Sequence, residues 1–349
     1  MPSLSPHRSP SDERSLPSVI PGRLTFLLLL TSLLHTVPVR AEGNDSRTRD
    51  RLESIMGPFP GPERRTPISH RVLSSTNGPG WVLQDIRYAA DPGDEVPAWL
   101  LLPAAASTNS TRAFPAVLAL HQTHAAGRNV VVGLGNSPDD EYGLELVRRG
   151  YVVLAPSYPH LAEYAPDLSK WYSGTMKAVW DNSRGLDLLA SLPCVATHRG
   201  FGVIGHSLGG HNGLFTAAFD PRLTAVVTSC GFDSFRDYQD GREDLWQRGR
   251  GWCQDRYMPR LAEYRGKLDR LPFDFADVLS AITPRPIFVN APQGDSNFRW
   301  RSVDRVVEEV VRRDAGRARI TVEHPDVPHR FPPEQRRQAY DLFDRVLRN

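Results

Sequence analysis

The sequence predicts an α/β fold, a doubly wound and mostly parallel sheet that is entered through an antiparallel hairpin. From Phe114 onward, continuous apolar runs of strand length alternate with helical stretches, which is typical of a parallel sheet buried on both faces. Two alternating runs, 81–88 and 96–102, precede this region and flank an Asp-Pro-Gly-Asp turn sequence at 91–94. These two runs predict the hairpin.

The strands of the parallel part are expected at 116–120, 151–155, 200–204, 223–228, 286–290 and 318–323. The helices between them are expected at 139–149, 173–191, 208–218, 302–313 and 333–347. The connection 231–283 is too long for a plain link between helix and strand. We therefore expect it to hold extra helices, in a cap-like insertion over the carboxyl end of the sheet, where loops of such folds bind ligands.

The first 80 residues contain two segments outside this domain, which spans 81–349. An apolar run at 24–34 follows Arg23 and precedes the small-residue site Val39-Arg40-Ala41, as in a secretory signal peptide. The run is too short to span a bilayer, which takes ~20 apolar residues in a helix. We expect a signal peptide over 1–41, cleavage after Ala41, a secreted or periplasmic protein and no stable membrane insertion. Residues 42–80 are rich in Arg, Pro, Gly and Ser and predict an irregular amino-terminal arm.

Charge and cysteine content argue against two classes of function. Without residues 1–41 the chain keeps 38 basic and 38 acidic side chains, from 42 and 40 in total, so no nucleic acid partner is implied. Cys194, Cys230 and Cys253 lack C-x-x-C spacing, so no zinc site is indicated and at most one disulfide can form, with Cys230–Cys253 the pair to test first. The sequence carries no signal for an oligomeric state.

A Gly-His-Ser-Leu-Gly segment at 205–209 follows an apolar strand and opens a helix, the context that makes G-x-S-x-G a nucleophile elbow. The turn must hold Ser207 in a strained conformation with its hydroxyl exposed at the sheet edge. Side chains two positions away on either side would collide, which explains Gly205 and Gly209. Ser207 is therefore the predicted nucleophile.

A serine hydroxyl needs a base to take its proton and a carboxylate to orient that base, and in this arrangement both follow the serine in the sequence. Asp295 comes shortly after the strand at 286–290 and is the preferred acid. Asp233, just past the preceding strand, is the alternative. His329 lies in the loop before the last helix and is the preferred base, since His211 is tied to the elbow's own helix and His324 ends the last strand.

The oxyanion of a tetrahedral intermediate needs two backbone N–H donors. One is expected from Leu208 and the other from the loop after 116–120, at Gln122 or Thr123. In that loop His121 and His124 stand three residues apart, but no third histidine or carboxylate cluster accompanies them, so we expect no metal there.

The chain resembles the dienelactone hydrolase and acetyl xylan esterase-like branch of the α/β-hydrolases. The segments that carry the resemblance are Leu120-His121-Gln122-Thr123, residues 150–156, residues 205–210, Pro284-Arg285-Pro286 leading to Asp295, and His329-Arg330-Phe331-Pro332. The resemblance implies an α/β-hydrolase fold and a hydrolase without cofactor that acts on small esters. The chain differs from dienelactone hydrolases proper in its serine nucleophile, where they use cysteine, and in lacking a plain His-Gly oxyanion loop.

The predicted reaction is therefore two acyl transfers, from an ester to Ser207 and from Ser207 to water activated at His329. Candidates for the pocket wall are His121, Trp171, Tyr172, Phe232, Phe235, Phe298 and Trp300. Two alternatives stay open. A serine peptidase of the prolyl-peptidase type would share the triad, and a non-catalytic binding protein would keep only the fold.

Overall fold

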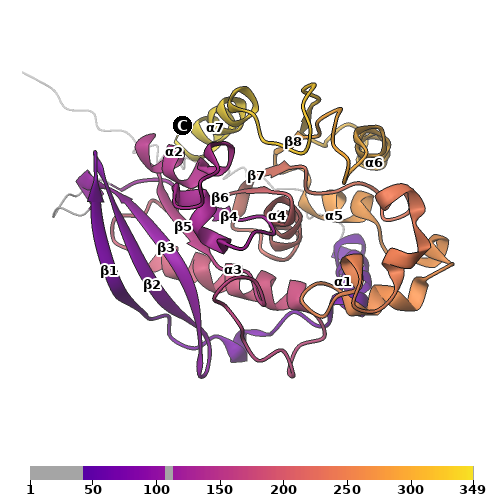
Figure 1. Ribbon diagram of the computed structural model, residues 1–349, viewed down its shortest axis with the longest axis horizontal. Helices are drawn as coiled ribbons and strands as arrows, with labels where there is room; N and C mark the ends of the chain where they lie inside the picture. The colour runs from indigo at the N-terminus through magenta and orange to yellow at the C-terminus, as the bar shows by residue number, and fades with distance from the viewer. Residues whose placement is uncertain (1–41, 107–112, 349) are drawn as a thin grey trace, which may run out of the picture. The chain divides into compact units, whose positions relative to one another are not determined.

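A computed structural model describes residues 42–106 and 113–348, so the predicted signal peptide lies outside the described chain. One nine-stranded sheet runs through these residues in the order β1-β2-β3-β5-β4-β6-β7-β8-β9 (Figure 1). The strands are β1 (His70–Gly78), β2 (Trp81–Asp91), β3 (Asp94–Pro103), β4 (Ala116–Leu120), β5 (Val152–Pro156), β6 (Phe201–His206), β7 (Leu223–Ser229), β8 (Ile287–Asn290) and β9 (Ile320–Glu323). The helices are α1 (Glu42–Met56), α2 (Tyr142–Arg148), α3 (Gly174–Ser191), α4 (Leu208–Phe219), α5 (Phe275–Ile282), α6 (Trp300–Arg313) and α7 (Pro333–Leu347).

The sheet is parallel from β5 to β9 and antiparallel at its amino-terminal edge. β4 pairs in parallel with both β5 and β6, whereas β2 pairs antiparallel with β1 and β3. All five residues of β4 are buried, which explains why its sequence is a continuous apolar run rather than an alternating one. The predicted fold class, a doubly wound and mostly parallel sheet behind an antiparallel hairpin, is confirmed.

The order of the central strands determines at which edge of the sheet a crevice forms. After β4 the chain moves to one side to form β5, then crosses to the other side to form β6 next to β4. Connections on opposite sides of the sheet diverge at such a switch point and leave a crevice beyond the carboxyl ends of the two strands. The loop after β4 and the turn after β6 meet at this crevice.

Helices cover both faces of the sheet (Figure 1). Apolar side chains of α2 and α7 pack in one core with one face of the central strands, including Leu146 and Phe343. Those of α3, α4 and α6 pack in a second, larger core on the other face, including Trp180, Phe215 and Val306. Burial of these two apolar layers stabilises the sheet from both sides.

The interpretation of 42–80 as an irregular arm is wrong for two of its parts. Residues 42–56 form α1, whose Leu52, Ile55 and Met56 are buried in the larger core. Residues 70–78 form β1, which lengthens the hairpin to three strands. Neither element has a strong pattern, because α1 is mostly polar and eight of the nine β1 residues are exposed.

The insertion 231–283 contains less regular helix than expected. Its one α-helix in the structure is α5, and the rest is built from short 3-10 turns such as Gly251–Cys253 and Pro259–Tyr264. Cys194, Cys230 and Cys253 are all free, so the considered Cys230–Cys253 disulfide is not formed. Among the described residues no helix is both long and apolar enough to cross a membrane.

Candidate active site

Ser207 sits in the sharp turn between β6 and α4. Its backbone has φ 52° and ψ −120°, in the left-handed region that residues with a side chain rarely occupy. The turn is held on both sides, since the Ser207 N–H donates to the carbonyl of Ser229 at 2.8 Å and the Ser207 carbonyl accepts from the N–H of His211 at 2.9 Å. Strain of this kind persists where the surrounding structure fixes it, as it does at functional sites.

The two glycines of the motif are required by close backbone contacts. A Cβ on Gly205 would lie 2.2 Å from the carbonyl carbon of Gly209. A Cβ on Gly209 would lie 1.9 Å from the carbonyl oxygen of Leu120, at the end of β4. Because glycine has no side chain, the turn after β6 can approach β4, the strand that leads into the predicted oxyanion loop.

Asp295 and His329 form a hydrogen-bonded pair across two loops. Nδ1 of His329 lies 2.9 Å from Oδ1 and 2.8 Å from Oδ2 of Asp295. Oδ1 also accepts the N–H groups of Asn297 at 2.8 Å and Phe298 at 3.2 Å. Burial raises the pKa of Asp295, but the hydrogen bond to His329 and these two N–H groups outweigh it, so the net pKa lies below its usual value. A carboxylate can only accept, so Nδ1 donates and Nε2 is left free to accept a proton.

Asp233, the alternative acid, has different surroundings. It is buried, and its Oδ2 accepts the N–H of Arg299 at 3.1 Å. Burial raises its pKa to about 8, with the Arg299 N–H opposing and nearby acidic groups adding to the rise. At neutral pH this carboxyl is mostly protonated, which is unsuitable for stabilising an imidazolium.

The candidate oxyanion groups lie on two elements at the switch point. Leu208 is the first residue of α4, where N–H groups have no acceptor within the helix. The loop after β4 is fixed by the side chain of Gln122, whose Nε2 donates to Oδ2 of Asp140 at 2.6 Å, and by the hydroxyl of Thr123, 3.2 Å from that of Tyr257.

A cavity of about 330 Å³ is lined by the predicted nucleophile, base and oxyanion residues, but not by Asp295. Its lining includes Ser207, His329, Leu208, Gln122 and Thr123. The remaining lining residues are His206, Tyr238, Gly251, Trp252, Gln254, Tyr257, Asn297 and Phe298. Three larger surface hollows of about 460 to 670 Å³ contain neither Ser207 nor His329. The smaller cavity is the one that pairs the predicted nucleophile with the predicted base.

Of the predicted pocket walls, only Phe298 lines this cavity. His121 is buried below it, where its Nε2 accepts the N–H of Tyr158 at 3.0 Å and its Nδ1 lies 2.8 Å from the carbonyl of Gln122. Phe232 stacks on Phe275 inside the core, at 5.0 Å between ring centroids.

The other predicted walls face elsewhere. Trp171 packs under the guanidinium of Arg64, and Tyr172 is half exposed under that of Arg260. Phe235 is buried in the core and Trp300 packs against His324. Six of the seven predicted wall residues therefore lie outside the lining of this cavity.

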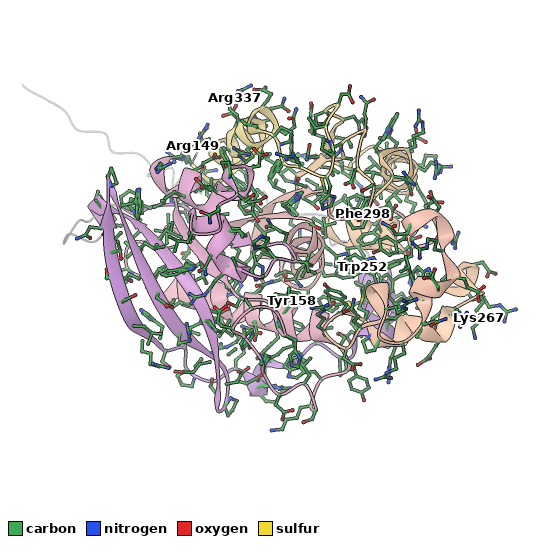
Figure 2. All side chains as sticks on the ribbon, in the orientation of Figure 1. Arg149, Tyr158, Trp252, Lys267, Phe298 and Arg337 are labelled. Atoms are coloured by element: carbon green, nitrogen blue, oxygen red, sulfur yellow. The ribbon has the colours of Figure 1, made fainter. Side chains whose placement is uncertain are left out.

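The walls that sequence reasoning missed come mainly from the insertion. Trp252 and Tyr257 meet edge to face at 5.2 Å between ring centroids. Trp252 also stacks on Phe298 at 6.3 Å, and both residues are labelled in Figure 2. The available signal was a cluster of aromatic residues in a long connection expected over the sheet edge. His206, inside the motif itself, is another missed residue, with its ring 4.8 Å from that of His329.

A metal is not favoured at this site. Cys230, Asp295 and His329 offer ligand atoms within 4.8 Å of one another. Asp295 and His329 are already hydrogen bonded, and burial, together with the charge of Asp295, raises the pKa of the Cys230 thiol well above its usual value. Metals bind the thiolate, so a thiol held in its protonated form makes this donor set a poor metal site.

Comparisons with known proteins agree on one architecture. A family model described as glucuronyl esterase of fungi matches residues 168–308, which include Ser207 and Asp295 but end before His329. A glucuronoyl esterase from Solibacter usitatus superposes with a TM-score of 0.66 at 16% identity, over 87% of this chain and 92% of that one. The chain has the α/β-hydrolase fold.

Two further structures with the α/β-hydrolase fold extend the likeness. A family 15 glucuronoyl esterase from Caldicellulosiruptor kristjansonii has a TM-score of 0.62 at 19% identity, covering 87% of this chain and 84% of that one. Acetyl xylan esterase 1 from Thermoanaerobacterium sp. JW/SL YS485 has a TM-score of 0.57 at 16% identity, covering 87% and 93%. A search of curated proteins found no match. The resemblance to α/β-hydrolase esterases predicted from the sequence is confirmed.

Proposed function

We propose that this protein is a serine hydrolase that cleaves carboxylic esters, with Ser207 as nucleophile, His329 as base and Asp295 as acid. The observation that carries the proposal is the Asp295–His329 hydrogen bond, in a pair whose histidine lines the same cavity as the elbow serine. With Nδ1 donating to Asp295, Nε2 of His329 is in the tautomer that a general base requires.

The reaction then runs as two acyl transfers. His329 takes the hydroxyl proton of Ser207 as the Ser207 oxygen attacks the ester carbonyl. The resulting oxyanion accepts hydrogen bonds from the backbone N–H of Leu208 and from that of Gln122 or Thr123. Collapse expels the alcohol, which leaves with the proton from His329. Water, deprotonated at the same imidazole, releases the acid from Ser207.

We propose a carbohydrate ester as the substrate. The family model and the similar structures are named for glucuronoyl and acetyl xylan esterases. The cavity lining supports a neutral ring, since it combines the aromatic faces of Trp252, Tyr257 and Phe298 with the amides of Gln254 and Asn297. It includes no arginine, lysine or carboxylate.

The test is Ser207→Ala, with Ser191→Ala on the surface of α3 as matched control. A fluorophosphonate probe should label the parent and the control but not Ser207→Ala. Hydrolysis of a benzyl ester of glucuronic acid and of p-nitrophenyl acetate should fall by at least ~10³-fold in the same variant. Labelling that persists in Ser207→Ala would reject the assignment.

The same panel separates the alternatives. Faster cleavage of fluorogenic dipeptides than of any ester would identify a peptidase. A folded parent that takes up no probe and cleaves neither class would be a binding protein.

We also propose export of the mature chain. The support is the apolar run at 24–34, with its small-residue site ending at Ala41. The amino terminus of protein collected from the medium or periplasm should begin at Glu42.

A further inference from the structure

The imidazole of His211 connects the helix that follows the nucleophile to the aromatic wall of the cavity. His211 lies one turn into α4 and is fully buried. Its ring stacks on the indole of Trp252, with 4.0 Å between centroids and 8° between planes. Since the His211 N–H donates to the Ser207 carbonyl at 2.9 Å, one residue contacts both the elbow and the wall.

Aromatic side chains enclose this ring. Within the described chain, neither ring nitrogen of His211 reaches a side-chain hydrogen-bond partner, and the polar group that the ring approaches is the backbone of Gly231. The remaining sides are closed by Phe215 at 4.9 Å and Phe275 at 5.4 Å. Burial lowers the pKa of His211 to about 3, against a smaller opposing effect of the Gly231 backbone, so the ring is neutral at ordinary pH. The ring contacts on its faces and edges therefore make the flat imidazole, rather than its charge, the feature that this side chain presents to Trp252.

Trp252 needs such a support because its own segment is irregular. It lies in the 3-10 turn Gly251–Cys253 of the insertion, between other short turns rather than on a strand or a long helix. Its ring lines the cavity beside Tyr257 and Phe298. α4, in contrast, is packed against the central strands and begins at the elbow.

We propose that His211 is a positioning residue that holds the indole of Trp252 at a set place relative to Ser207, and so determines how tightly an ester bearing a ring is bound. The proposal rests on the proposed function for its substrate, an ester with a sugar or aromatic ring. It makes no use of a proton on His211, because a neutral flat ring suffices.

The experiment compares three variants. His211→Leu keeps a similar volume but removes the flat face, and His211→Phe keeps a flat face without nitrogens. Phe219→Leu, at the other end of α4, removes a buried ring that stacks on Phe59 and makes no ring contact with His211 or Trp252 among the described residues. Each is assayed with benzyl glucuronate and with vinyl acetate, after a thermal melt has shown that it is folded.

We expect His211→Leu to raise KM for benzyl glucuronate about tenfold, with kcat for vinyl acetate changed by less than about twofold. His211→Phe should restore KM to within about twofold of the parent, and Phe219→Leu should resemble the parent. An unchanged KM in folded His211→Leu would overturn the proposal. So would an equal fall in kcat for both esters, which would place the effect at the elbow.

A measurement without substrate separates this proposal from the proposed function. The fluorescence of Trp252, obtained as the difference between each protein and its Trp252→Phe counterpart, should change in His211→Leu but not in Phe219→Leu. If no protein hydrolyses any ester, the proposed function fails and this difference alone decides the positioning role. An identical Trp252 signal in His211→Leu and the parent would refute that role.

Discussion

Replacement of Asp295 by asparagine tests the orientation of the base most directly. Both backbone donors, the N–H groups of Asn297 and Phe298, point at Oδ1 of Asp295. In Asp295→Asn the amide oxygen must take that position, because an NH₂ group cannot accept these N–H groups. The NH₂ group then takes the place of Oδ2, 2.8 Å from Nδ1 of His329, and its hydrogens favour the tautomer in which Nδ1 accepts, in competition with the amide oxygen at 2.9 Å.

The magnitude follows from this change of tautomer. With Nδ1 accepting, the proton of His329 moves to Nε2, which can no longer take the proton of Ser207. Loss of the correct tautomer in a Ser-His-Asp triad costs about 10⁴-fold in kcat, or ~5.5 kcal/mol of transition-state stabilisation. We expect Asp295→Asn to lower kcat for p-nitrophenyl acetate by this order, with little change in the melting temperature.

The matched control is Asp233→Asn. Burial raises the pKa of Asp233 to about 8, so the carboxyl is already mostly neutral at pH 7 and an amide replaces it with little electrostatic change. The kcat of the Asp233→Asn variant at pH 7 should stay within about twofold of the parent value. If Asp295→Asn keeps more than a tenth of the parent kcat while Asp233→Asn loses most of it, the acid has been assigned to the wrong strand end.

Three further predictions concern stability. The pKa of Asp233 is raised in the folded state, so its favourable contribution to the free energy of unfolding is complete below pH ~4. That contribution is lost as the pH rises through about 8. Asp233→Asn should therefore raise the melting temperature at pH 8.5 and leave it unchanged at pH 3.5, and equal shifts at both pH values would contradict this. Gly209→Ala places a Cβ 1.9 Å from a backbone oxygen, whereas the nearest atom to a Cβ on Gly213 is 3.2 Å away in a side chain. Soluble yield and activity should collapse in the first variant and persist in the second; an active, stable Gly209→Ala would disprove the tight approach. Lys177→Met should lower the free energy of unfolding in urea by ~3–5 kcal/mol, because buried Asp181 loses its buried cationic partner. A loss below about 1 kcal/mol would show that this ion pair is not important for stability.

Local signals accounted for most of the sheet. β4 and α7 have the predicted bounds, because an apolar run of strand length and an amphipathic helix after Pro332-Pro333 both leave a clear pattern. α1 and β1 were missed for the opposite reason. α1 buries few apolar side chains near its end, and β1 is an exposed edge strand whose backbone pairs with β2 without burying a face.

The pocket was the least predictable part of the site. Phe232 follows β7 as closely as a site residue would, yet its ring points into the core against Phe275. Trp252 and Tyr257 reach the cavity from short turns whose path no local pattern specifies. The direction of a side chain at a strand end depends on the backbone turn that follows, and the sequence pattern does not give that turn.

From the sequence alone, the elbow and the alternation of strands and helices could be recognised, since each depends on residues close together in the chain, and a serine, an acid and a histidine could be predicted in that order. The tertiary structure decided which carboxylate reaches His329 and which aromatic rings face Ser207. Those choices depend on hydrogen bonds and ring contacts between loops far apart in the chain, whose relative positions are set only when the two cores close on the sheet.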